Sequence, residues 1–150
     1  MGKKKILILD NSNLSYVGSD INGPILRGTE TSLILLSEEL AKKNLDVFFA
    51  TKTNQGKKIN GVHYINKNDI DKEKVYDLAI AVSNANLFNK IKSIKKAVFS
   101  VSNQSLEKFL RKRQFISTYT HKPVIVTLCD YQFKKRSFLT SPFGKLTIPI

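Results

Sequence analysis

The chain has 150 residues, 41% of them hydrophobic and 25% charged, which suits one folded domain and excludes a disordered chain. Its 25 Lys and Arg against 12 Asp and Glu give a net charge of +13, which favours nucleic acid, phosphorylated small molecules or an acidic membrane surface as partners. A single cysteine excludes an internal disulfide. No apolar run reaches the roughly 18 residues of a membrane span, and Met1–Ile6 is unlike a signal peptide. We therefore expect a cytoplasmic protein.

The first third of the chain predicts a strand, a long loop and a helix. Lys4–Asp10 reads as a buried strand, because its apolar residues run without alternation. Asn11–Gly28 is rich in Asn, Ser and Gly, and a loop of this length inside a domain is usually functional. Thr29–Asn44 is the clearest helix of the chain.

The sequence of this helix also predicts how it begins, packs and ends. We expect Thr29 to cap it, Glu30 to oppose the positive end of its dipole, and Asn44 to stop it in the left-handed conformation. An apolar face at three- and four-residue spacing is formed by Leu33, Leu36, Leu40 and Ala41. Ion pairs four residues apart are expected for Glu38 with Lys42 and for Glu39 with Lys43.

The rest of the chain alternates short apolar runs with polar or helical segments. Further strands are expected at Asp46–Thr51, Val62–Ile65, Asp77–Val82, Ala97–Val101, Val124–Leu128 and Lys145–Ile148. Asn54–Lys58 reads as a turn, and helices are expected at Leu87–Ile94, from Ser105 onward and at Tyr131–Leu139. Seven strands alternating with helices predict an α/β fold: a Rossmann-like doubly wound, mainly parallel sheet with helices on both faces, in a single domain over residues 1–150.

Polar residues follow several of these strands where each one ends. They are Asp10-Asn11, Ser83-Asn84, Ser102-Asn103 and Asp130. The carboxyl ends of parallel strands meet at one edge of the sheet, and ligands of such sheets bind there. The pattern therefore predicts a small-molecule cleft at that edge.

Three segments follow one another along the chain: Lys4–Asp10, Arg27-Gly28-Thr29-Glu30 and Asn44-Leu45-Asp46-Val47. They resemble the amino-terminal half of the GT-B glycosyltransferases of the family 4 type. That family shows a first strand, a Gly-Gly-x-Glu turn opening a long helix, and a Gly-His-x-Val stretch before the second strand. Val124–Gln132 and Lys145–Ile150 are similar to the last strand and helix before the interdomain linker. Arg27 stands where the motif has its first glycine.

This resemblance implies an enzyme that transfers a sugar from a nucleotide-sugar to a saccharide or lipid-linked acceptor of a cell envelope, without an obligatory metal or another cofactor. The half seen here would bind the acceptor. A carboxyl-terminal donor domain, which we expect to be missing from these 150 residues, or a partner chain would hold the donor. The chain alone is then expected to be catalytically incomplete.

The resemblance and the strand ends together give the candidate site residues. The cleft that binds acceptor or donor would include Arg27, Gly28, Thr29, Glu30, Ser102, Asn103, Asp130 and Tyr131. The alternative for these positions is an ordinary loop with helix caps, since Ser and Asp are strong caps. No residue is assigned as catalytic, and the two histidines, His63 and His121, have no ligand-type neighbours, so no metal site is expected.

Two basic clusters near aromatic residues form a second candidate surface. They comprise Lys108, Arg111, Lys112 and Arg113 in one run and Lys134, Lys135 and Arg136 in another. Such a surface could bind anionic lipid or a phosphorylated acceptor and hold the protein at the inner face of a membrane. The alternative is a solvated helix face.

Two other function classes stay open on sequence alone. A non-enzymatic basic α/β module would use the net charge of +13 to bind nucleic acid, although no nucleic-acid motif lies among the basic runs, which makes this partner less favoured. A flavodoxin-like carrier is the third alternative.

Overall fold

The computed structural model describes residues 2–54, 56–89, 91–100, 124–127 and 146–147. These residues form a mixed α/β fold with one α-helix and two short 3-10 helices, η1 and η2. The elements in chain order are β1 (Lys5–Leu9), η1 (Gly18–Asn22), α1 (Gly28–Lys42), β2 (Asp46–Thr51), β3 (Lys57–Ile59), β4 (Val62–Asn66), β5 (Val75–Val82), η2 (Ala85–Phe88), β6 (Lys92–Ser100), β7 (Val124–Thr127) and β8 (Leu146–Thr147).

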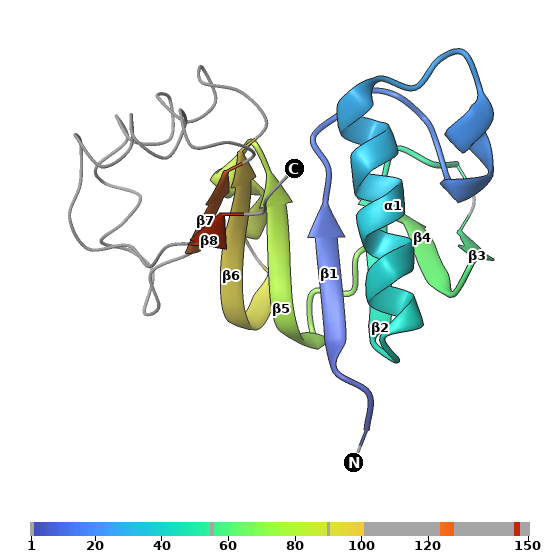
Figure 1. Ribbon diagram of the computed structural model, residues 1–150. Coiled ribbons are helices and arrows are strands. Elements are labelled where there is room, and N and C mark those ends of the chain that lie inside the picture. The colour runs from blue at the N-terminus through green and yellow to red at the C-terminus, as the bar shows by residue number, and fades with distance from the viewer. Residues whose placement is uncertain (1, 55, 90, 101–123, 128–145, 148–150) are drawn as a thin grey trace, which may run out of the picture.

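The strands form one sheet in the order β3-β4-β2-β1-β5-β6-β7-β8. Every neighbouring pair is parallel except β3 with β4. From β1 the chain first builds outward through β2 to β4 and then returns to the other side of β1 with β5. The strand order therefore reverses between β1 and β5, whose carboxyl ends lie at the upper edge of the sheet in Figure 1.

The expectation of a mostly parallel α/β sheet is confirmed. The strand expected at Asp46–Thr51 has those bounds, and the other six expected strands overlap β1, β4, β5, β6, β7 and β8. The largest difference is in β6, which begins at Lys92 rather than at Ala97. The prediction works for β1 because Ile6 to Leu9 are all buried, which is the condition under which a strand shows an unbroken apolar run.

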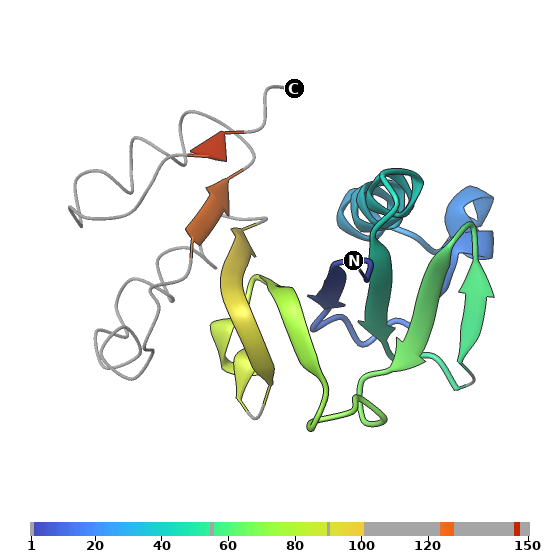
Figure 2. The same cartoon turned by 90° about the horizontal axis from the view of Figure 1, so that it is seen from below.

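Both faces of the sheet are covered by apolar side chains. Ile6 and Ile8 of β1 point toward α1, where they pack in one core cluster with Leu33. Leu7 and Leu9 point to the opposite face, in a second cluster that includes residues of η2. The alternation follows from the two-residue repeat of a strand, and Figure 2 shows α1 and η2 on opposite sides of the sheet.

Helix α1 ends as expected but begins and pairs differently. Asn44 has φ 62°, the left-handed conformation that stops a helix. The cap at the start is Arg27, whose side chain makes no capping hydrogen bond, so Thr29 is not the cap. The described side chains buried on α1 are Glu30, Leu33, Ile34 and Ser37; Ile34 therefore takes the place expected for Leu36.

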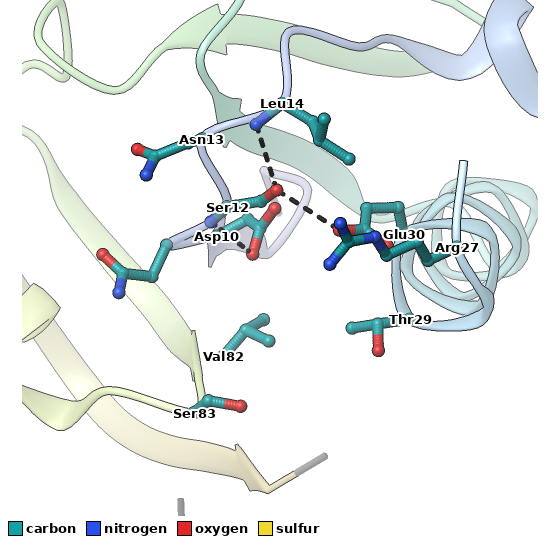
Figure 3. A pocket seen from close by; sticks show the side chains of 10 residues that line it. Asp10, Ser12, Asn13, Leu14, Arg27, Thr29, Glu30, Val82 and Ser83 are labelled. Carbon is teal, nitrogen blue, oxygen red and sulfur yellow. Dashed lines mark hydrogen bonds between the residues drawn. The ribbon is translucent and has the colours of Figure 1, made fainter. Parts of the chain in front are cut away.

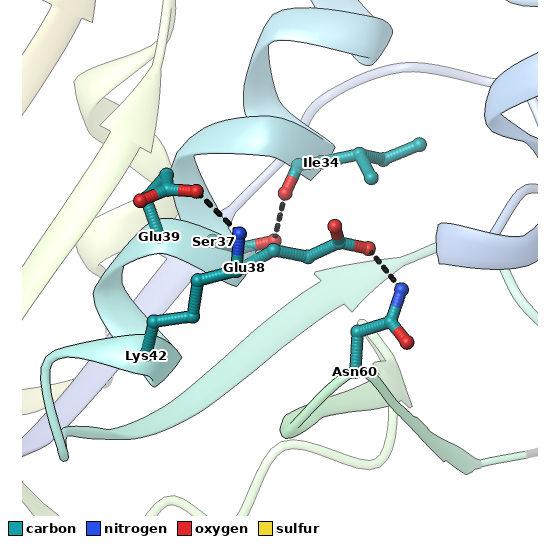
Figure 4. A network of polar contacts seen from close by, with 6 residues as sticks. All are labelled: Ile34, Ser37, Glu38, Glu39, Lys42 and Asn60. Carbon is teal, nitrogen blue, oxygen red and sulfur yellow. Dashed lines mark hydrogen bonds and ion pairs between the residues drawn. The ribbon is translucent and has the colours of Figure 1, made fainter.

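The polar contacts on α1 also correct the expected spacing of ion pairs. The Lys42 ammonium lies 2.6 Å from a Glu39 carboxylate oxygen, three residues away rather than four. Glu38 accepts a 2.9 Å hydrogen bond from Asn60 Nδ2 in the turn between β3 and β4 (Figure 4). Glu38 thus links α1 to the edge of the sheet instead of pairing along the helix.

Two other expectations are wrong. Leu87–Ile94 is not a helix: η2 ends at Phe88, β6 begins at Lys92, and Ile94 is exposed on that strand. The extended pairing of β6 with β5 decides this segment over its helix-like apolar spacing. The last residues of the expected turn at Asn54–Lys58 belong to strand β3, which begins at Lys57.

The helices expected from Ser105 onward and at Tyr131–Leu139 lie outside the described residues. Within the described part of the chain, none of the helices has the combined length and apolar composition needed to cross a bilayer.

Candidate functional site

A cleft of about 490 Å³ opens at the carboxyl edge of the sheet, between β1, β5 and the start of α1. This is the point where the strand order reverses, and open parallel sheets bind their ligands at such points. The volume falls in the range of small-molecule sites. Its lining residues are Asp10, Asn11, Ser12, Asn13, Leu14, Arg27, Thr29, Glu30, Val82 and Ser83.

Asp10 follows β1 directly and forms the floor of this cleft. Its side chain is buried, and both carboxylate oxygens accept hydrogen bonds: Oδ1 from the Ser12 amide at 3.1 Å and Oδ2 from the Tyr16 hydroxyl at 2.7 Å. Burial raises the pKa of Tyr16 well above its usual range, and the adjacent Asp10 charge raises it further. Asp10 therefore organises the loop after β1.

Ser12 connects that loop to helix α1. Its hydroxyl donates to Glu30 Oε1 at 3.2 Å and accepts from the Leu14 amide at 3.1 Å (Figure 3). Glu30 is only 7% exposed, and its second oxygen, Oε2, is buried with no hydrogen-bond partner among the described residues. A carboxylate with one free oxygen thus lies in the α1 wall of the cleft.

The first turn of α1 presents backbone donors at the same place. The first amides of a helix have no acceptor within it, and the Arg27 side chain provides none. The helix dipole adds partial positive charge here, and the exposed Arg27 adds a full one. The rim of the cleft can therefore attract an anion, while the carboxylates of Asp10 and Glu30 lie on its floor and its α1 wall.

The opposite wall is the end of β5, with Val82 and Ser83. Ser83 has φ 58°, a left-handed conformation that is uncommon for a residue other than glycine. Its amide donates to the Phe99 carbonyl at 2.8 Å, which ties the turn to β6. Its hydroxyl oxygen is buried with no hydrogen-bond partner in the described part of the chain.

Three of the four site residues expected at the start of α1 line the cleft: Arg27, Thr29 and Glu30. Gly28 is the first residue of the helix, is exposed, and would meet no atom within 4 Å if it carried a Cβ. The other expected residues lie outside the described residues: Ser102, Asn103, Asp130 and Tyr131 of the cleft, and all seven residues of the two basic clusters.

The strand-end pattern is confirmed for Asp10, Asn11 and Ser83, which line the cleft. Asn84 instead caps η2, accepting from the Asn86 amide at 3.0 Å. Sequence reasoning missed the linking role of Ser12 between the loop and Glu30, because a loop serine carries no pattern that predicts its partner.

The described residues contain no group of three or more His, Cys, Asp or Glu placed to hold an ion. Both Asp10 oxygens already accept hydrogen bonds, and Lys67 Nζ lies 3.4 Å from the Ser12 carbonyl oxygen, adding a cation beside the loop. The polar groups that line the cleft can hydrogen-bond to an organic ligand.

Comparison of the chain with protein-family models, with curated proteins and with solved structures finds no match.

Proposed function

We propose that this chain is the acceptor-side domain of a GT-B glycosyltransferase, which transfers a sugar from a nucleotide-sugar to a saccharide or lipid-linked acceptor. The observation that carries the proposal is the cleft at the strand-order reversal, walled by the first turn of α1 and the end of β5. That turn is the segment in which Arg27-Gly28-Thr29-Glu30 resembles the family motif.

The finer fold that we propose is a Rossmann-like, doubly wound sheet with helices on both faces. It is supported by the order of the parallel strands, β4-β2-β1-β5-β6-β7, which matches the strand order of dinucleotide-binding sheets. It is also supported by the positions of α1 and η2, which pack on opposite faces. The helices expected after β6 and β7 would complete the two layers.

We assign the donor and the acceptor to different parts of the cleft from the charges of its residues. Arg27 and the open amides of the α1 first turn would face the diphosphate of the donor. The polar floor and walls would hold the acceptor. A second domain or a partner chain would supply most contacts to the nucleotide-sugar, and the reaction would take place between the two.

Calorimetric titration with UDP-glucose and GDP-mannose, together with a Gly28→Val variant, tests this proposal. A side chain at Gly28 meets no described atom within 4 Å, so the variant should fold while its bulk obstructs ligand approach to the start of α1. Gly2→Val is the matched control, because Gly2 also faces open space but precedes β1, at the other edge of the sheet. Binding that is lost in Gly28→Val and kept in Gly2→Val supports the proposal; equal binding by both variants contradicts it.

Nucleic-acid binding is the second candidate function, favoured by the net charge of +13 and by the exposed Lys3, Lys4 and Lys5. Titration with a single-stranded oligonucleotide at low and high salt separates the two. Salt-sensitive binding of the oligonucleotide, combined with no response to either nucleotide-sugar, would favour the nucleic-acid module.

A further inference from the structure

Two hydrogen-bonding oxygens on facing walls of the cleft have no partner among the described residues. Glu30 Oε2 belongs to α1, and Ser83 Oγ belongs to the turn after β5; both atoms are buried. A buried polar atom without a partner costs free energy, and native proteins seldom leave one unexplained. Of the four such side-chain atoms among the described residues, these two lie on walls of one cleft, where a ligand can supply the missing hydrogen bonds.

Glu30 can offer an acceptor to such a ligand without disturbing the fold. The Ser12 hydroxyl holds Oε1 and leaves Oε2 free. Glu30 lines the cleft, and the last torsion of a glutamate side chain is broad, so its carboxylate can rotate to present Oε2 to a ligand there. An ionised carboxylate accepts hydrogen bonds and donates none, which requires a donor group on the ligand.

Ser83 complements this acceptor from the other wall. A hydroxyl both donates and accepts, so it can pair with a second hydroxyl of the same ligand. The hydrogen bond from the Ser83 amide to the Phe99 carbonyl oxygen holds the backbone of the turn in place, although its φ of 58° is unfavourable for serine. The Ser83 hydroxyl therefore sits on a fixed turn.

Charge selects among ligands that carry hydroxyl groups. Asp10 and Glu30 are the carboxylates of the cleft, and both are buried. A phosphate placed between them would be repelled, whereas the hydroxyls of a neutral sugar ring would meet an acceptor on one wall and a hydroxyl on the other.

We propose that the space between the α1 and β5 walls of this cleft is a saccharide subsite in which Glu30 and Ser83 hydrogen-bond two hydroxyls of one neutral sugar ring. The proposal rests on the function proposed above and deepens it, because it assigns the neutral sugar of the acceptor to the space between the two walls and leaves the anion to the rim around Arg27.

Ligand-observed NMR titration with methyl α-D-glucopyranoside and methyl α-D-mannopyranoside tests the subsite, with inorganic phosphate as the anionic probe. Glu30→Gln keeps the shape and an oxygen for Ser12 but removes the charge, and should weaken glycoside binding about tenfold. Ser83→Ala should weaken it roughly three- to tenfold. Glu39→Gln is the matched control, since Glu39 is an exposed glutamate of the same helix outside the cleft, and should bind glycoside as the wild type does.

Circular dichroism confirms the fold of each variant, and two independent variants keep the test decisive if one of them unfolds. Failure of the wild type to bind either glycoside, or unchanged affinity in both folded variants, overturns the subsite. Binding of UDP-glucose or GDP-mannose in the same preparation tests the proposed function separately. Nucleotide-sugar binding without glycoside binding would reject the saccharide subsite and leave the proposed function standing, whereas glycoside binding that Glu30→Gln and Ser83→Ala both weaken would support the subsite.

Discussion

The Tyr16 hydroxyl donates a 2.7 Å hydrogen bond to Asp10 Oδ2 and closes the loop that follows β1 onto the end of that strand. The same tyrosine is held from two other directions. Its carbonyl oxygen accepts from Thr51 Oγ1 at 3.0 Å, and its ring meets the Phe49 ring edge-on at 5.9 Å. Because β2 supplies both contacts, the floor of the cleft is anchored in the core of the sheet.

Removal of this hydroxyl should destabilise the domain. Tyr16→Phe leaves Asp10 Oδ2 buried without its donor, and we expect the free energy of unfolding to fall by about 1–3 kcal/mol. Urea denaturation monitored by circular dichroism measures this free energy.

Tyr76→Phe is the control for that substitution. Tyr76 is also buried, but the described residues show no hydrogen bond from its hydroxyl, so the loss should be smaller. Equal losses in the two variants would mean that the bond to Asp10 contributes nothing specific.

Alanine substitution at two glycines should change the stability of the domain in opposite directions. Gly61 has φ +83°, and a Cβ there would lie 3.2 Å from Ala41 Cβ, so Gly61→Ala should lower stability by about 1–2 kcal/mol. Gly28 meets no described atom within 4 Å and begins α1, so Gly28→Ala should raise stability by about 0.4–1 kcal/mol. Thermal denaturation of both variants compares them, and a shift in the same direction for both would be inconsistent with these backbone conformations.

The cost of placing a side chain at Gly18 should depend on the hydroxyl of a neighbouring tyrosine. A Cβ at Gly18 would lie 2.8 Å from the Tyr64 hydroxyl oxygen, so Gly18→Ala should cost roughly 1–3 kcal/mol. Removing that oxygen with Tyr64→Phe should recover part of the loss. A double-mutant cycle measures the coupling, and strictly additive losses would show that the two groups do not meet.

High pH should unfold the domain by ionising buried tyrosines. Burial raises the pKa of Tyr64 from 10.0 to about 12, and burial beside Asp10 also raises the pKa of Tyr16. Because these folded-state values lie above the unfolded value, the associated stability is fully present below pH 10 and is lost as the pH rises toward about 12.

Tyrosinate absorbance and circular dichroism recorded along one alkaline titration check this. We expect the absorbance of the buried tyrosines to rise together with the loss of secondary structure. Ionisation of every tyrosine near pH 10 with the fold intact would refute it.

The sheet was largely predictable because its central strands leave clear patterns. β1 is buried on both faces and shows an unbroken apolar run. The prediction of a helix at Leu87–Ile94 is wrong because its apolar residues fit a helix face, whereas long-range pairing with β5 makes its last residues part of β6. Strand β3 had one usable signal, Asn60-Gly61, whose φ values of 48° and 83° fit a two-residue hairpin turn.

The candidate site was predictable only in part. Asp10 and Ser83 follow from the rule that ligands bind at the carboxyl ends of parallel strands, and Glu30 follows from the resemblance. The hydrogen bonds from Ser12 to Glu30 and from Tyr16 to Asp10 depend on the path of a long loop. Local sequence does not determine that path, because it is set by packing against β2 and α1.

Amide NMR titration of the isotope-labelled chain with UDP-glucose tests the central claim most directly, because it locates the ligand residue by residue. We expect the shifted resonances to cluster at the strand-order reversal, on Asn11, Ser12, Thr29, Glu30 and Ser83. Shifts confined to the opposite edge of the sheet, around Lys3, Lys4 and Lys5, would contradict this.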